Sequence, residues 1–358
     1  MRLFCLFLLL LPMHLFANSL KLKLLDEYII PANAEIQKHR IGGLSSIDFS
    51  GSGYVFIADD SKQPRFFTAQ IDIRDNRFSQ VQFDAVTLLK DEKELPFADN
   101  QVDPEGLRVL NNNMGMVWIS EGLINRQVPP AIFIQSANKT VRLPLPSMFE
   151  PAPNSGPRHN AVFEGISKSH DGQGIWVSME GSLQQDGEEA NMTHGSSVRV
   201  SHYDLANGKL GQQFVYPLDP IVKREDAPAN AFRTTGLVEL LQLDKNRFLT
   251  MERSFTAGVS DGGNDVKIYM VDITGATDTS KLHSLKQASF QPGRKSLLLD
   301  LASIKSKLPS KHIDNLEGMT FGPRLGNGNL SLLMVADNNF NLYQPQLNQL
   351  LLFELQLD

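Results

Sequence analysis

Carboxylate side chains recur in this sequence at two positions of a repeated segment. Three glutamates each precede a glycine and an apolar residue, and five further acids each end a short apolar run downstream. The first set is Glu105, Glu164 and Glu317, and the second set is Asp59, Glu121, Glu180, Glu252 and Asp337. Carboxylates gathered in one place raise one another's pKa or require a cation. Oxygen ligands from several chain segments suit Ca²⁺ best, and Mg²⁺ or Mn²⁺ less well.

Basic residues flank several of these acids. A metal ion and nearby basic side chains can together neutralise the oxygens of a phosphoryl group. The candidates for binding a substrate are Arg126, Arg158, Arg253 and Lys311, and the candidates for catalysis are Glu164, His159 and Glu252. Alternatively, each arginine only pairs with its neighbouring acid. The pattern favours hydrolysis of an ester or phosphoester if the basic residues converge on the acids.

The spacing of the repeat predicts the fold. The repeat glycines, Gly43, Gly106, Gly165, Gly236 and Gly318, precede the acid that ends the next apolar run by 15 to 19 positions. Units of about sixty residues with almost no helical periodicity are typical of four-stranded propeller blades with long loops. We therefore expect an all-β protein, a β-propeller of about five blades, with a sixth blade inside an insertion left open.

The blade geometry predicts where the acids lie. In a propeller, the innermost strand of each blade starts on the face where the second strand ends, so both sets of acids should meet near the central axis. Alternatively, the Glu-Gly pair is architectural, with the glycine in a special backbone dihedral and the glutamate capping backbone amides. The last unit lacks a fourth strand and residues 20–25 lack a partner, so we expect the N-terminal strand to close the ring.

The N-terminus has the layout of a signal peptide. An apolar run from Leu3 to Leu11 precedes a predicted cleavage site after Ala17, which makes residues 1–17 the signal peptide and 18–358 a single propeller domain. The run is too short to span a bilayer, and we expect a secreted or periplasmic protein without stable membrane insertion once the peptide is removed. Cys5 is the sole cysteine and lies in this peptide, so the mature chain has no disulfide or thiol chemistry.

Several classes of function are disfavoured. The net charge is −6 and the sequence shows no Lys/Arg cluster, which argues against nucleic acid as a partner. The motifs of serine hydrolases, zinc peptidases and nucleotide-binding loops do not occur. We expect a monomer that acts on a small-molecule ester or phosphoester.

The same residues resemble the phytase-like family, also described by the esterase-like activity of phytase. The matching stretches are Asp103–Leu107, Asn160–Ile166, Met251–Ser254, Ile268–Ile273, Asn315–Met319 and Val335–Asn338. The resemblance extends from about Gly42 to Phe353, and it implies an exported, propeller-like phosphatase or phytase-type esterase assisted by calcium. It supplies no nucleophile.

Three functions therefore remain open from the sequence. The first is a calcium-dependent phosphoesterase. The second is a calcium-dependent lactonase or carboxylic esterase, which would polarise a carbonyl and would need fewer basic groups. The third is a non-catalytic module that binds a ligand or a protein and in which calcium is structural.

Overall fold

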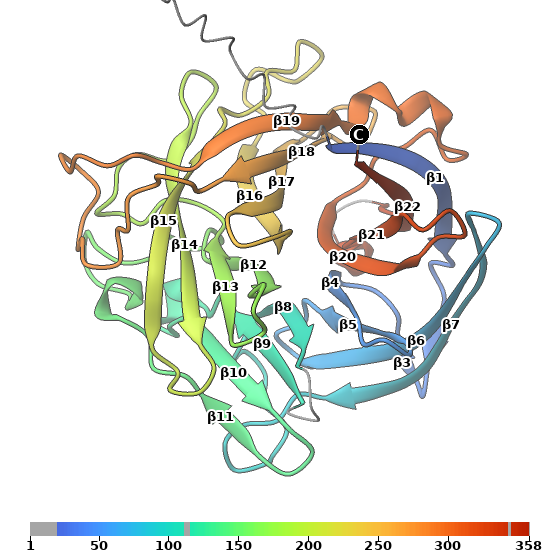
Figure 1. Ribbon diagram of the computed structural model, residues 1–358, viewed down its shortest axis with the longest axis horizontal. Helices are drawn as coiled ribbons and strands as arrows, with labels where there is room; N and C mark the ends of the chain where they lie inside the picture. Colours follow the sequence, from blue (N-terminus) through green and yellow to red (C-terminus); the bar gives the residue numbers. More distant parts are fainter. Residues whose placement is uncertain (1–19, 111–114, 343–344, 358) are drawn as a thin grey trace, which may run out of the picture.

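The protein is a five-bladed β-propeller. The computed structural model describes residues 20–110, 115–342 and 345–357. Their strands form five four-stranded antiparallel sheets around a central axis, together with one short hairpin (Figure 1). The prediction of an all-β propeller is confirmed, and the described strands make five blades without a sixth. The predicted signal peptide, residues 1–17, lies outside the described residues.

The blades follow one another along the chain. The first blade contains β4 (Leu44–Phe49), β5 (Tyr54–Ala58), β6 (Arg65–Arg74) and β7 (Arg77–Leu88). The second contains β8 (Pro104–Val109), β9 (Met116–Ser120), β10 (Ala131–Gln135) and β11 (Thr140–Arg142). The third contains β12 (Phe163–Lys168), β13 (Gly174–Met179), β14 (Ser196–Asp204) and β15 (Leu210–Leu218). The fourth contains β16 (Arg233–Gln242), β17 (Arg247–Thr256), β18 (Asn264–Asp272) and β19 (Arg294–Asp300).

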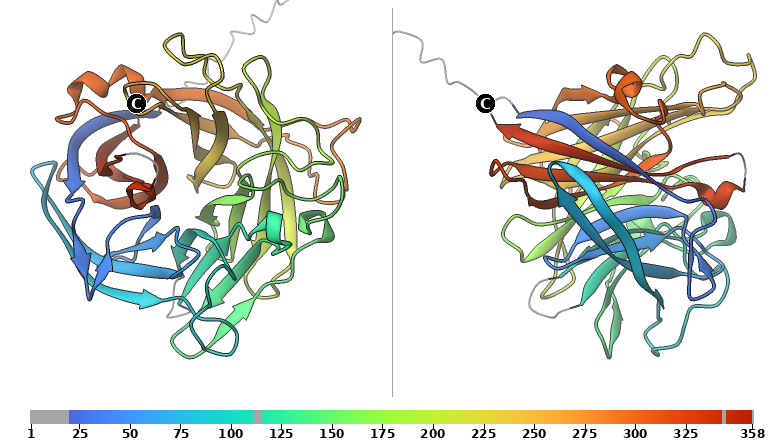
Figure 2. Two further views of the ribbon diagram at one scale, coloured as in Figure 1. Left: turned by 180° about the vertical axis from the view of Figure 1, so that it is seen from behind. Right: turned by 90° about the vertical axis from the view of Figure 1, so that its right-hand side faces the viewer.

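The fifth blade closes the ring with strands from both ends of the chain. It contains β20 (Leu316–Arg324), β21 (Leu330–Ala336), β22 (Asn348–Leu357) and β1 (Leu20–Ile30), in that spatial order. Strand β1 pairs with β22 in antiparallel register from Leu20 opposite Leu357 to Ile30 opposite Asn348, and the two strands lie side by side in every view (Figures 1 and 2). The predicted closure by the N-terminal strand is confirmed.

The remaining elements are short. The hairpin of β2 (Glu35–Ile36) and β3 (His39–Arg40) links β1 to the first blade. Within the part of the chain that the structure describes, five single-turn 3₁₀ helices lie in the loops: η1 (Ile124–Arg126), η2 (Ser147–Phe149), η3 (Leu301–Ser303), η4 (Lys305–Lys307) and η5 (Asn339–Asn341).

Apolar and aromatic side chains between adjacent blades form the core. Trp176 of the third blade lies 5.6 Å from Phe214 in its own blade and 5.2 Å from Phe248 in the fourth, measured between ring centroids. All three side chains are buried, so the packing between sheets holds neighbouring blades in a fixed orientation.

The glycine of each Glu-Gly pair permits close packing of the inner strands. Strands β4, β8, β12, β16 and β20 surround the axis, and each contacts the next (Figure 1). A Cβ atom on Gly106 would lie 3.0 Å from the carbonyl oxygen of Glu164, and one on Gly318 would lie 2.8 Å from Cα of Ser46. Neither glycine has a positive φ. The glycine is therefore required for close approach, and the alternative of a special dihedral is not supported.

In the first and fourth blades, the strand register differs from the one expected when the five repeat glycines are taken as equivalent positions. In the second blade, a bulge at Glu105 separates the pairs Pro104–Ser120 and Gly106–Ile119. In the first blade, the corresponding bulge is at Ser45, two residues beyond Gly43. In the fourth blade, it is at Val238, two residues beyond Gly236. The alignment of Gly43 and Gly236 with the other repeat glycines was therefore wrong by three positions.

Candidate metal centre

Seven of the predicted acids lie together around the central axis of the propeller, and they form the acidic ring. Glu105, Glu164 and Glu317 occupy the second position of inner strands β8, β12 and β20. The other four, Asp59, Glu121, Glu180 and Asp337, immediately follow second strands β5, β9, β13 and β21. Each of the seven interacts electrostatically with at least one of the others.

One backbone hydrogen bond places the second-strand acid in four of the blades. The amide of Asp59 donates to the carbonyl oxygen of Gly43 at 2.7 Å, and that of Glu121 donates to Asp103 at 3.0 Å. The amides of Glu180 and Asp337 make the same contact, to Val162 and Asn315 respectively. The accepting residue always lies two positions before the bulge of the inner strand, so the two sets of acids are brought to one level of the ring.

Three carboxylates are spaced to share one ion. Asp59, Asp103 and Glu105 each offer one oxygen, and these oxygens all lie within 4.8 Å of one another. Ca²⁺ binds oxygen ligands at about 2.3–2.6 Å, so oxygens on its two sides are up to about 5 Å apart. Sequence reasoning did not assign Asp103 to the metal, although it stands two residues before Glu105 in the Asp-Pro-Glu-Gly stretch.

A fourth carboxylate next to this group has an unsatisfied oxygen. Oε2 of Glu121 is buried and has no hydrogen-bond partner, and the residue is only 5% exposed. The carboxyl groups of Asp103 and Glu180 are its main electrostatic neighbours. Buried polar atoms are nearly always paired with a partner, so this oxygen provides evidence for a ligand that is independent of the acid cluster. An all-carboxylate donor set fits Ca²⁺.

The acids are strongly perturbed by their surroundings. Burial, and then the neighbouring carboxylates, raise the pKa of Asp59, Glu105, Glu121 and Glu164 well above the usual range. Burial raises the pKa of Asp103 to about 6 and of both Glu180 and Asp337 to about 7. Burial also raises the pKa of Glu317 to about 8 against the opposing effect of Arg253. Without a cation, the ring therefore retains protons near neutral pH.

Arg253 occupies the position that an acid occupies in the other four blades. Because Leu237 pairs with Glu252 immediately before the bulge in β16, Arg253 is the residue that reaches the ring. Its Nη2 donates to Oε1 of Glu317 at 3.0 Å, while its Nε is buried without a partner. Burial disfavours the charge, but four acids outweigh this effect and raise the pKa of Arg253: Glu317, Glu180, Glu164 and Asp337. On one side of the acidic ring, four acids thus surround Arg253. The group that could hold a metal lies on the opposite side.

Glu252 lies outside the ring. Its carboxylate accepts hydrogen bonds from the Tyr216 hydroxyl and from Nζ of Lys295, both at 2.5 Å. Lys295 also donates to Asp219 at 2.6 Å. Glu252 and Lys295 both belong to the fourth blade, so their buried ion pair lies within that blade. The hydroxyl of Tyr216, in outer strand β15, links Glu252 to the third blade. The one-residue difference between Glu252 and Arg253 follows from the bulge, which the sequence alignment did not place.

Glu252→Gln tests this placement. The variant should lose about 1–3 kcal/mol of unfolding free energy, because a buried hydrogen bond between charged groups becomes weaker. It should retain whatever stabilisation the parent protein gains from Ca²⁺, because Glu252 does not contribute to the ring. Urea unfolding with and without Ca²⁺ measures both quantities. A variant of unchanged stability that no longer responds to Ca²⁺ would contradict this placement and would return Glu252 to the ring.

The other predicted basic residues lie in surface loops. Arg126 and His159 are exposed, and Nε2 of His159 lies 2.9 Å from Nδ2 of Asn125. Arg158 is partly buried and donates to the carbonyl oxygen of Gly187 at 2.7 Å. Lys311 is exposed. Of the four predicted substrate-binding residues, Arg253 alone contacts the ring acids among the described residues.

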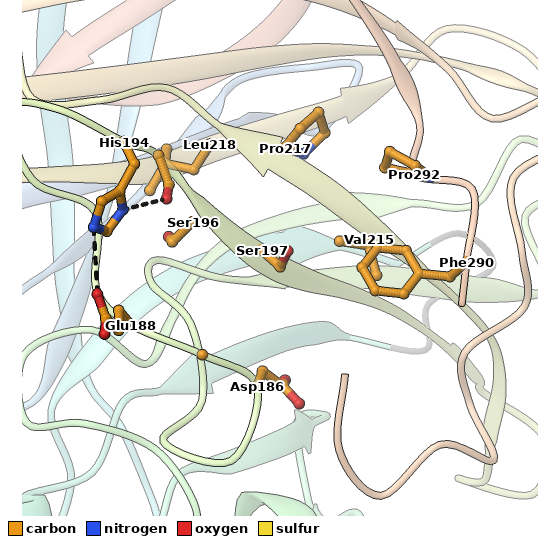
Figure 3. A pocket seen from close by; sticks show the side chains of 12 residues that line it. Asp186, Glu188, His194, Ser196, Ser197, Val215, Pro217, Leu218, Phe290 and Pro292 are labelled. Carbon is orange, nitrogen blue, oxygen red and sulfur yellow. Dashed lines mark hydrogen bonds and ion pairs between the residues drawn. The ribbon is translucent and has the colours of Figure 1, made fainter. Parts of the chain in front are cut away.

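A separate groove lies over the outer strands of the third blade. It has a volume of about 520 Å³, and β14, β15 and the segments around Glu188 and Phe290 line it. His194 and Glu188 lie at one end, 3.4 Å apart, and Phe290 and Pro292 lie at the other (Figure 3). None of the ring acids lines this groove.

The comparisons with known proteins identify the family. The family model described as phytase-like, esterase-like activity of phytase, matches residues 39–340. The chain belongs to the phytase-like family. The match covers all five inner strands and every ring acid, so the acids described above are part of the phytase-like region itself.

The relatives of this phytase-like chain are distant. An uncharacterized secreted protein of Arthroderma benhamiae is 26% identical over 182 residues, which is 44% of this chain and 35% of that protein. The chain therefore spans about a third of the length of this curated relative. The solved structures include an endo-arabinase of Bacteroides thetaiotaomicron, with 11% identity and a TM-score of 0.46 over 92% of this chain and 98% of that chain. The allergen Mala s 1 of Malassezia sympodialis has 8% identity and a TM-score of 0.36 over 88% and 93% of the two chains.

The described residues contain no helix that is long and apolar enough to cross a membrane.

Proposed function

We propose that this protein is an exported, Ca²⁺-dependent hydrolase of phosphoesters or other esters, with its active site at the acidic ring. The observation that carries the proposal is the group formed by Asp59, Asp103 and Glu105, whose oxygens lie within 4.8 Å of one another, together with the unpaired buried oxygen of Glu121. The secreted relative supports export. The family description supports ester chemistry.

The metal would be held by Asp59, Asp103, Glu105 and Glu121. Bound Ca²⁺ would polarise the phosphoryl or carbonyl group and offset charge that develops in the transition state. The positive charge of the ion would in turn favour the ionised form of these four carboxylates in spite of their burial.

Arg253 would bind the anionic part of the substrate. Its guanidinium makes one hydrogen bond to Glu317, and its Nε is buried without a partner. Arginine suits phosphate or carboxylate oxygens because its planar group donates in parallel to two oxygens. The substrate would then lie between the arginine side of the ring and the side that holds the metal.

Glu164 and Glu180 would handle protons. Burial raises the pKa of Glu164 well above its usual range and that of Glu180 to about 7, and a general acid or base works best near the operating pH. As water attacks and the ester bond breaks, Glu164 would donate its proton to the departing oxygen, and Glu180 would accept a proton from the attacking water. The other acids on this side, Glu317 and Asp337, hold Arg253 in place.

The nature of the ester is decided by an assay. Because Arg253 is the one predicted basic residue that reaches the ring acids among the described residues, a lactone or carboxylic ester fits the site as well as a phosphoester does. Purified protein is incubated with p-nitrophenyl phosphate, phytate, p-nitrophenyl acetate and simple lactones, with Ca²⁺ or with EDTA. We expect chelator-sensitive turnover of at least one class. Turnover of none, or turnover that EDTA does not affect, contradicts the proposal.

The metal-free protein should lose stability as the pH rises. Burial raises the pKa of Asp103 to about 6, of Glu180 and Asp337 to about 7 and of Glu317 to about 8. The folded state therefore binds more protons than the unfolded state, and the resulting stabilisation is complete below the unfolded pKa of about 4 and is lost as the pH rises through 6 to 8. Urea unfolding in EDTA should show this decline, and Ca²⁺ should reverse it at high pH. Flat or rising stability in EDTA over this range would contradict the described charge distribution.

The groove over β14 and β15 favours a second candidate function, a non-catalytic binding module. A cavity of about 520 Å³ with polar and apolar ends is within the size range of small-ligand sites. In that case Ca²⁺ would be structural. Ca²⁺ would then raise the melting temperature, and none of the ester substrates would be turned over.

A further inference from the structure

The turn that follows β21 connects two of the ring acids. Asp337 immediately follows β21, and its Oδ1 accepts a hydrogen bond from the amide of Asn339 at 2.7 Å. The side-chain oxygen of Asn338 accepts a hydrogen bond from the amide of Gly43 at 3.0 Å. The carbonyl oxygen of Gly43 in turn accepts one from the amide of Asp59 at 2.7 Å. A continuous series of contacts thus runs from an acid of the fifth blade to an acid of the first.

The ring of Phe340 packs against this series. A Cβ atom on Gly43 would lie 2.4 Å from Cε2 of Phe340, and one on Gly42 would lie 3.1 Å from Cδ1. Gly43 also has a φ of +63°, so glycine is required there both for its backbone conformation and for the contact with the aromatic ring. This requirement explains the Gly42-Gly43 pair that the sequence alignment assigned to the blade repeat.

Two arginines hold Phe340 against the glycines. The guanidinium of Arg65 lies 5.2 Å from the centroid of the Phe340 ring, within the range of a cation–π interaction. Nη1 of Arg40 donates to the carbonyl oxygen of Phe340 at 3.1 Å. Arg65 is itself buried and donates to Asp60 at 2.5 Å, so the phenylalanine is fixed on its outer side as well.

The backbone of the turn has a costly conformation. Asn339, Phe340 and Asn341 have φ values of +45°, +48° and +57°, and none of them is glycine. Consecutive left-handed residues persist only where surrounding contacts over-determine them, and such strain clusters at functional sites. Here, the contacts that impose the conformation are the hydrogen bonds of Asp337 and Asn338 and the packing of Phe340 on Gly43. The same contacts connect Asp337 to Asp59.

We propose that Phe340 and Asn338 are positioning residues, which hold the carboxylates of Asp59 and Asp337 in the ring across the junction of the first and fifth blades. The inference rests on the proposed function in so far as Asp59 is a metal ligand. Residues that orient metal ligands typically change metal affinity by about 10–100-fold when they are replaced. Phe340 acts through Gly43, whose carbonyl fixes the backbone of Asp59.

The test compares Phe340→Leu with Phe83→Leu as a matched control. Phe83 is also partly buried and packs against Phe56 at 5.3 Å and Phe67 at 5.9 Å, but it lies in the outer strand β7, away from the ring. Calorimetric titration of the purified protein with Ca²⁺ should show affinity reduced about tenfold in Phe340→Leu. Affinity should be unchanged in Phe83→Leu, although both variants lose stability. Phe340→Tyr, which keeps the ring, should restore the affinity. Equal affinity in Phe340→Leu and the parent overturns the inference.

A second measurement does not depend on calcium. Hydrogen exchange in EDTA reports the protection of the Asp59 amide, which donates to Gly43. Exchange there should be faster in Phe340→Leu than in the parent and in Phe83→Leu. If the parent protein binds no Ca²⁺, the proposed function fails, while faster exchange at Asp59 still supports the positioning role. Unchanged exchange at Asp59 overturns that role in either case.

Discussion

Glu105→Gln is expected to become more stable in the metal-free state and to lose its response to Ca²⁺. Glu105 is 6% exposed, and burial is the main cause of its raised pKa. The neighbouring carboxylates raise the pKa further; they are Asp59, Glu164, Glu121 and Asp103. Replacing a buried, crowded carboxylate by an amide of the same shape removes repulsion and desolvation cost. It also removes a charged ligand from the group that would hold the ion, and the number of ligand charges tunes calcium affinity. We expect affinity to fall at least about 100-fold, with a matching loss of turnover.

The opposite signs of these two effects make the experiment decisive. A protein with ligand present at 100 times its dissociation constant gains about 2.7 kcal/mol of unfolding free energy, and the variant should gain almost none of this. The control is Glu225→Gln, which makes the same chemical change at an acid whose side chain is 85% exposed and pairs with Lys223. That variant should behave as the parent does. If Glu105→Gln is destabilised in EDTA, Glu105 is an architectural cap of backbone amides; if the variant binds Ca²⁺ as tightly as the parent, the metal site is elsewhere.

The sequence was sufficient to predict the blades because their signals are local. Each apolar run that ends in an acid is one strand, and the unpaired N-terminal segment and the incomplete last unit together predicted the closure of the ring. Seven acids were correctly expected near one axis, because strand direction alone determines the face on which they emerge. These inferences needed only the alternation of strands.

The register was harder to predict because a bulge shifts every later residue by one position. The alignment relied on glycine, yet Gly43 is required for the packing of Phe340 and Gly236 for the packing of the Glu180 side chain. At the true repeat position, the first and fourth blades carry Ser46 and Glu239 instead. The error placed Glu252, and not Arg253, at the position in the fourth blade that reaches the ring acids.

Loop conformation limited the assignment of the remaining site residues. His159 and Lys311 are near the ring acids in sequence, but the loops that carry them turn outward to solvent. Asp103 was omitted because it belongs neither to a Glu-Gly pair nor to the end of a second strand. Its distance of two residues from Glu105 was the available signal.

The largest loss of stability is expected from Arg108→Met, at the centre of the ring. Arg108 and Glu239 form an ion pair at 2.7 Å, and each side chain is 1% exposed. Arg108 also donates to Ser46, Ile47 and Met319, while Glu239 accepts a hydrogen bond from the amide of Ile166. One pair therefore joins the inner strands of all five blades.

Removing the arginine leaves Glu239 as a buried, unpaired charge. Breaking a buried ion pair from one side costs about 3–5 kcal/mol, whereas replacing both partners costs much less. Urea unfolding should therefore show a large loss for Arg108→Met and a substantial recovery in Arg108→Met combined with Glu239→Gln, since glutamine still accepts from Ile166. The matched control is Arg74→Met, which breaks an exposed pair with Asp72 and should have almost no effect. If Arg108→Met costs no more than this control, the pair does not hold the blades together, and the close packing permitted by Gly106 and Gly318 must account for the integrity of the ring by itself.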